Sequence, residues 1–374
     1  MTRFKIKKNF QKAGVKAKSI TVEMMHQASR KLNIRQASLT TFAILGASFG
    51  FATFSSPASA ALFVRDSFND AALSIDAFGS TSNNGTLQTN VPVGASILKA
   101  YLYASSIWNY SPINDVKLNG NLLKVSDAVV VASDTNSTTT VLWDVTSLLS
   151  SLGGLQNHTI EELGDNDGET LVVAYKNAST TGFSSFIFDG ALATTGDTTK
   201  FNFAQPYNNG DFLVSLASTY SYQPSGQFTT VDVTTNSTNS RRLTSSAGGQ
   251  DDGEPANGAL ITAGGIGDSP TNPDPFASSE GGFRTDDELY NLALGNITDA
   301  SPFIKSGDTF VELKTTNPSN NDNVYGLFVT STFKTSRPST SVPEPSALLG
   351  LLAFIAFGGF RLNRKQNKQV VTQD

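Results

Sequence analysis

Short runs of β-branched and aromatic residues, separated by turn-forming residues, are the feature that most restricts the fold of this chain. Between residues 61 and 342 these runs are rich in Val, Thr, Phe and Tyr, and Ser/Thr/Asn-rich stretches separate them. Asn119 and Gly120 lie between two such runs and form a strong hairpin signal, because both residue types accept a positive φ. This spacing is typical of a β-sandwich or a jelly roll.

Strands account for nearly all of the predicted secondary structure. Helical signals are confined to residues 146–152, which follow Asp144 and precede two glycines, and to residues 288–294, which follow Asp287. We therefore expect an all-β, sandwich-like or jelly-roll-like body with one or two short helices. The predicted strands are 97–103, 116–118, 122–125, 129–132, 139–143, 159–163, 170–175, 184–188, 200–203, 212–218, 228–233, 259–262, 309–314 and 324–333.

The body is expected to span residues 61–336, followed by a polar linker at 337–341. Its length allows one large domain or two ordinary ones. The longest irregular part, 245–285, indicates a functional loop or a boundary between sub-domains. The chain has no cysteine, which excludes disulfides and thiolate zinc sites, so an apolar core must hold the fold.

The first 60 residues have the three parts of a secretory signal peptide. Residues 1–36 are basic, residues 39–54 are apolar and uncharged, and Ala58 and Ala60 occupy the small-residue positions of a cleavage site. We expect the Sec machinery to export the chain and signal peptidase to cut after Ala60. The alternatives are a retained N-terminal anchor and a translation start at Met24 or Met25.

A second apolar segment lies at the other end of the chain. Residues 346–360 carry no charge and as a helix would measure about 22 Å, less than the roughly 30 Å of a bilayer core. Arg361, Arg364 and Lys365 follow it and favour a cytoplasmic C-terminus, which places the body outside the cell. A permanent single-span anchor is one interpretation of this segment, and a temporary anchor is the other.

Val342, Pro343, Glu344 and Pro345 precede this helix, and the order of motif, short apolar helix and basic end resembles the PEP-CTERM sorting signal of exosortase-processed bacterial proteins. The resemblance covers residues 342–368. It implies recognition by a membrane-embedded, cysteine transpeptidase-like enzyme, cleavage near the two prolines, and release or attachment at the cell surface. Such proteins often accompany exopolysaccharide or biofilm genes.

The body also resembles a secreted β-rich domain of unknown function found in bacterial and archaeal surface proteins. This resemblance implies a sandwich fold and no known activity. The residues that carry it are 99–103, 116–120, 143–149, 167–177 and 187–190.

The charge of the body narrows the choice of partner. Residues 61–342 contain 13 Lys and Arg against 29 Asp and Glu, a formal charge of −16. This disfavours nucleic acid and suits cations. Asp165, Asp167 and Glu169 stand at alternate positions, as in calcium loops, although the segment departs from the EF-hand pattern. Calcium is the one cofactor that the residues indicate, and a simple Asp-Gly turn is the alternative.

Few residues suit catalysis. His158 is the only histidine left after signal removal and is expected in a turn before a strand, and the body lacks a G-x-S-x-G motif before a helix. We therefore expect no enzyme. Trp108 and Tyr110 lie between strands and could stack on sugar rings, although core packing or strand edges explain them more simply.

These features predict an exported surface or extracellular-matrix protein with a structural or interaction role associated with exopolysaccharide. A calcium-assisted carbohydrate-binding module is the alternative, and a secreted hydrolase is a third possibility. The residues do not identify the binding partner or the attached group.

Overall fold

The computed structural model describes residues 62–79, 82–107, 113–135, 138–192, 196–219, 229–247, 260–272, 275, 288–317 and 323–336. These residues belong to the same unit of the chain and consist of strands, loops and short 3₁₀ helices. The expected all-β fold is therefore confirmed. No helix in these ranges is long and apolar enough to cross a membrane. The expected signal peptide, linker and sorting tail lie outside the described residues.

The first half of the body is a sandwich of two antiparallel sheets, ordered β2-β10-β4-β8-β7 and β3-β9-β5-β6. In each sheet a late strand lies between two early ones, because β10 lies between β2 and β4, and β9 lies between β3 and β5. This nested pairing is the jelly-roll arrangement. The strands are β2 (Ala72–Gly79), β3 (Asn84–Val91), β4 (Ser96–Ile107), β5 (Val116–Leu118), β6 (Asn121–Leu123), β7 (Val129–Thr135), β8 (Thr138–Asp144), β9 (Gly154–Glu162) and β10 (Gly168–Lys176).

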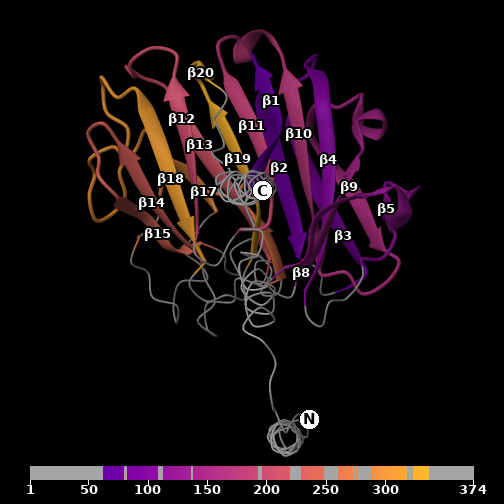
Figure 1. The fold of residues 1–374 in the computed structure, drawn as a ribbon. Helices are drawn as coiled ribbons and strands as arrows, with labels where there is room; N and C mark the ends of the chain where they lie inside the picture. The colour runs from indigo at the N-terminus through magenta and orange to yellow at the C-terminus, as the bar shows by residue number, and fades with distance from the viewer. Residues whose placement is uncertain are drawn as a thin grey trace, which may run out of the picture. The chain divides into compact units, whose positions relative to one another are not determined.

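The second half repeats this nesting, with β19 between β11 and β13 and β18 between β12 and β14. The first and last strands, β1 (Leu62–Asn69) and β20 (Thr335–Ser336), extend its two sheets beside β11 and β12. Figure 1 shows these strands from magenta to yellow, apart from the indigo β1. The other strands are β11 (Ser184–Gly190), β12 (Asp197–Phe203), β13 (Phe212–Thr219), β14 (Thr229–Thr235), β15 (Arg241–Ala247), β16 (Ile261–Ala263), β17 (Leu289–Asn291), β18 (Phe310–Thr316) and β19 (Asn323–Ser331).

Among the residues that the structure describes, three apolar clusters fill the spaces between four sheets. One lies inside the first sandwich, a second lies inside the second sandwich, and the third joins β2, β4 and β10 to β11, β13, β16 and β19. Successive side chains of β10 point to opposite faces of its sheet and so belong to two clusters. Leu171 and Val173 point into the first sandwich, whereas Val172 points into the junction. Strands β10 and β11 are therefore buried on both faces.

The chain crosses between the two sandwiches twice, and the two crossings are hydrogen-bonded to each other. Asp70 follows β1, and its Oδ1 accepts the backbone N–H of Gly182, which precedes β11. Thr180 Oγ1 donates to the carbonyl oxygen of Asp70 at 2.6 Å. Asn177 caps the short helix η3 (Ala178–Thr180) by accepting the N–H groups of Ser179 and Thr180. These hydrogen bonds thus hold the two connecting segments against each other.

Several local expectations were wrong. Residues 288–294 do not form a helix; Leu289–Asn291 is strand β17, which pairs with β13 because Tyr290 fills the second core. The helix predicted at 146–152 is a 3₁₀ helix, η2 (Thr146–Leu149). The described strands within and beside 245–285, which are β15, β16 and β17, all belong to the second sandwich, and the two crossings between the sandwiches lie at 70–71 and 177–183.

Candidate functional site

The predicted calcium ligands lie in different surroundings. Asp165 is exposed, Asp167 is half-buried, and Glu169 is fully buried in β10. In the part of the chain that the structure describes, no group of three or more Asp, Glu or His side chains is gathered closely enough to hold a metal ion. Calcium binding stays a prediction.

Glu169 has a different neighbour, Glu162 of β9, which is also buried. Burial is the main cause that raises the pKa of Glu169 well above its usual value, and the charge and hydrogen bond of Glu162 raise it further. Two buried carboxyl groups this close retain a proton more readily than either would alone. Beside them, Asn166 joins the β9–β10 loop to the segment before β5, since its Oδ1 accepts the backbone N–H of Asn114 at 2.8 Å.

His158 is buried inside strand β9, so its expected position in a turn was wrong. Its Nε2 lies 2.9 Å from Thr89 Oγ1 of β3, and its Nδ1 lies 3.0 Å from Asn119 Nδ2 in the β5–β6 turn. Burial lowers the pKa of the ring, which favours the neutral imidazole. His158 therefore joins three elements of the outer sheet as a structural residue.

The predicted sugar-stacking residues, Trp108 and Tyr110, lie outside the described residues, as do the sorting-motif, membrane-stop and signal-cleavage positions. Their roles stay predictions.

A cluster of buried polar side chains lies at the junction of the two sandwiches. Arg65 of β1 forms two hydrogen bonds to Asp189 of β11, from Nε to Oδ2 at 2.7 Å and from Nη2 to Oδ1 at 3.0 Å. Tyr103 of β4, in the other sandwich, donates its hydroxyl hydrogen to the same Oδ2 at 3.1 Å. The side chain of Asp189 is only 4% exposed. Burial raises the pKa of Asp189, and the hydrogen bonds from Arg65 and Tyr103 oppose this shift. The charged form of Asp189 therefore depends on these two partners.

A second polar contact crosses the same junction. Thr170 Oγ1 of β10 lies 2.5 Å from the hydroxyl oxygen of Tyr325 in β19. The Tyr103 ring packs against Tyr325 and Phe328, with centroids 5.9 and 6.0 Å apart. The junction therefore combines apolar packing with buried hydrogen bonds, which fix the register of the two inner sheets.

A hollow of about 250 Å³ also opens at this junction, between β2 and β10 on one side and β13, β17 and β19 on the other. Residues of both sandwiches line this half-open hollow.

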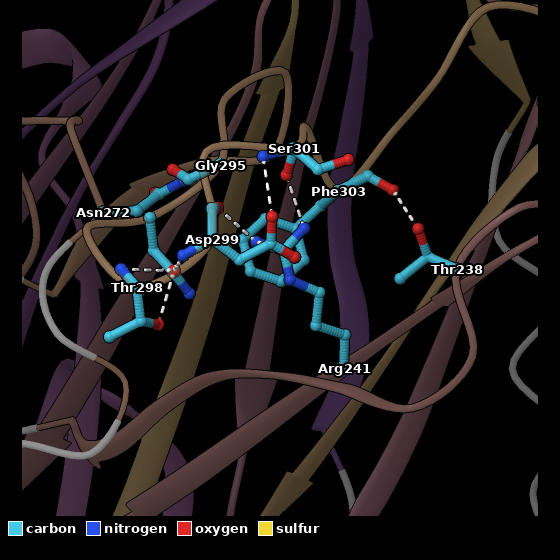
Figure 2. A network of polar contacts seen from close by, with 9 residues as sticks. Thr238, Arg241, Asn272, Gly295, Thr298, Asp299, Ser301 and Phe303 are labelled. Atoms are coloured by element: carbon cyan, nitrogen blue, oxygen red, sulfur yellow. Dashed lines mark hydrogen bonds and ion pairs between the residues drawn. The ribbon is translucent and has the colours of Figure 1, made fainter.

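A separate polar network fixes a loop of the second sandwich, as Figure 2 shows. The Arg241 guanidinium lies 4.0 Å from the centroid of the Phe303 ring and donates to the carbonyl oxygens of Ser301 and Asp299. Thr238 Oγ1 donates to the carbonyl oxygen of Phe303 at 2.8 Å. These contacts attach the loop to β15 and its turn, which is a structural role.

Sequence reasoning did not single out the residues of the junction. Arg65 lies in a strand that was not predicted, and Tyr103 was read only as part of an alternating strand. Asp189 carried a usable signal, because a single acid in the otherwise uncharged strand Ser184–Gly190 indicates a buried carboxylate that needs a partner.

Comparison with known proteins assigns no family. No family model matches the chain, and no curated protein matches it. One solved structure, the major capsid protein P2 from bacteriophage PM2, is 11% identical, with 72% of this chain and 99% of that chain covered, at a TM-score of 0.19. A likeness at this level carries no argument about fold or function.

Replacing Arg65 by Met should lower the free energy of unfolding by about 2–3 kcal/mol, because the buried Asp189 carboxylate then keeps only Tyr103. Adding Asp189→Asn to that variant should restore part of the loss, since no charge remains to be stabilised. The control is Lys117→Met, which breaks an ion pair between half-exposed and exposed groups and should cost less than about 1 kcal/mol. Urea unfolding measures all three, and equal losses for Arg65→Met and Lys117→Met would contradict this role of the junction.

The pKa of Glu169 predicts a pH dependence of stability. The folded value lies above the unfolded one of about 4.3, so the stabilising contribution is complete below that pH and declines as pH rises through the folded pKa. Asp76, whose pKa rises to about 7, contributes with the same sign. Glu169→Gln stays uncharged, so its free energy of unfolding should fall less than that of the wild type between about pH 5 and pH 8. Urea titrations at several pH values test this.

The matched control for this prediction is Glu161→Gln, one residue from Glu162 but paired with Lys117 at the surface. It should keep the wild-type pH slope. A wild-type slope in Glu169→Gln as well would show that the buried pair does not hold the proton.

Proposed function

We propose that this protein is exported, is sorted at the cell envelope through its C-terminal tail, and serves as a structural or interaction component of the cell surface or extracellular matrix. Its partners in this proposal are the Sec machinery, signal peptidase, an exosortase-type membrane protease and extracellular polysaccharide. The supporting sequence features are the signal-like segment at 1–60 and the PEP-CTERM-like segment at 342–368.

The observation that carries the proposal is how the two end strands are placed between these segments. Strand β1 begins at Leu62, next to the expected mature N-terminus at Ala61, and β20 ends at Ser336, directly before the expected linker. The Leu62 N–H donates to Asp197 Oδ2 at 3.0 Å, so the first residue of β1 is held by β12. Both expected cuts thus fall outside the strands of the body, where cleavage would leave the sheets intact.

The topology supports a division of roles between the sandwiches. Both end strands belong to the second sandwich, and the whole first sandwich is inserted between β1 and β11. A tether at the C-terminal end therefore loads the second sandwich through β20, while the first sandwich is presented without a chain end of its own. The fold has no cysteine, so its stability is independent of the redox state outside the cell.

Mass spectrometry of the protein from cells and medium tests this proposal. We expect an N-terminus at Ala61 and a C-terminus before Ser346, because both terminal segments are removed. The double substitution Pro343→Ala and Pro345→Ala should retain the tail, whereas Pro338→Ala in the linker should be processed normally. A native product that ends at Asp374, or equal processing of both variants, would contradict sorting by this motif.

A further inference from the structure

The hollow between the two sandwiches has a floor set by strand register. In the inner sheet of the second sandwich, Ser215 lies opposite Leu289 on one side and Phe328 on the other. In the next row Leu213 lies opposite Thr330. All five residues line the hollow. The floor of the hollow is lowest at Ser215, because this small side chain lies between the large apolar side chains of Leu289 and Phe328.

The loop after β16 keeps the hollow open. Ser215 Oγ is turned toward the carbonyl oxygen of Gly264, to which it donates at 2.5 Å. A Cβ on Gly264 would lie 2.2 Å from the Glu288 carbonyl oxygen, and one on Gly265 would lie 2.1 Å from that of Ile75. Only glycine allows this approach, so no side chain from these two positions can fill the space.

The same loop is attached to the first sandwich, because the Ile266 N–H donates to the Ile75 carbonyl oxygen at 2.9 Å. The wall is therefore fixed by backbone contacts to both sandwiches. When the space for a ligand is already formed, less ordering of the protein opposes binding.

The residues that line the hollow determine which ligand it suits. None of them carries a formal charge, and burying a charged group without a partner is costly, so the ligand is neutral. Leu213, Leu289 and Phe328 provide an apolar floor. Tyr175, which is half-buried and packs against the first core, and Asn90, which is exposed, provide polar groups to the lining. Burial raises the pKa of Tyr175, so its hydroxyl stays protonated and can donate.

We propose that this hollow is a binding site for a small, neutral molecule that has an apolar part and hydroxyl groups, as alkyl glycosides have. The apolar part packs on Leu213, Leu289 and Phe328, and the hydroxyl groups bond to Tyr175 and Asn90. The volume of about 250 Å³ lies just below the range of pockets for drug-sized ligands, which restricts the site to small molecules. This site is independent of the tail and of its processing.

Titration calorimetry of the purified full-length chain with hexyl β-glucoside tests the proposal. We expect saturable binding and at least tenfold weaker binding of hexyl sulfate, which has the same apolar part but a charge. Tyr175→Phe removes one hydroxyl without changing the shape and should weaken hexyl β-glucoside binding about fivefold. Ser215→Leu fills the floor and should abolish binding. Tyr207→Phe alters a half-buried tyrosine in another loop and should bind like the wild type.

The Tyr175→Phe result decides even if Ser215→Leu fails to fold, because the smaller change leaves the packing intact. No saturable binding by the wild type would overturn the proposal. So would unchanged affinity in Tyr175→Phe, or equal affinity for hexyl sulfate, since either would place the ligand elsewhere or on a non-selective apolar surface.

Discussion

The contact of Arg65 and Tyr103 with the buried Asp189 carboxylate is the interaction on which the arrangement of this molecule depends. It joins β1 and β11 of one sandwich to β4 of the other, and it buries the Asp189 side chain to 4% exposure while Arg65 stays 30% exposed. A buried Asp189 carboxylate without the Arg65 guanidinium would be an unpaired charge and would destabilise the contact between the two inner sheets. With the guanidinium in place, the two sheets can pack in one register. Around it, Ile75, Val172 and Phe328 make the apolar part of the junction. Separation of the sandwiches would expose these side chains and leave the carboxylate unpaired.

The same junction explains how two similar sandwiches act as one body. The chain enters the second sandwich with β1, builds the whole first sandwich, and returns with β11. The two crossings are tied by Asp70, Thr180 and Gly182. Because the crossings are fixed and the inner sheets are buried on both faces, the space between the sandwiches is a constant feature of the surface.

The sequence predicted the fold class well and the long-range contacts poorly. Apolar alternation located strands such as β4, β8 and β13, and Asn119-Gly120 marked the hairpin of β5 and β6, because these signals are local. Strand β3, with Thr, Gln and Asn between Leu87 and Val91, was missed because few of its residues are apolar. Residues 288–294 were misread because packing of Tyr290 in the core outweighed a local helix signal.

The candidate sites show the same limit. Alternating acids predicted a shared cluster at Asp165, Asp167 and Glu169, but β10 carries Glu169 into the core while the loop leaves Asp165 exposed. The actual neighbour of Glu169 is Glu162, which approaches from the facing sheet. Likewise, Arg65 and Asp189 are 124 positions apart in the chain. Contacts between strands that are distant in the chain depend on topology, which spacing along the chain does not encode.

Hydrogen exchange of the full-length chain tests most directly whether the two sandwiches are one cooperative body. The central amides of β10 and β11, at Val172 and Ile187, lie on opposite sides of the junction. If the junction holds the sandwiches together, both amides exchange only through the same global opening, with opening free energies that agree within about 0.5 kcal/mol. If Val172 exchanges through an opening several kcal/mol easier while Ile187 stays protected, the sandwiches unfold separately and the account is wrong.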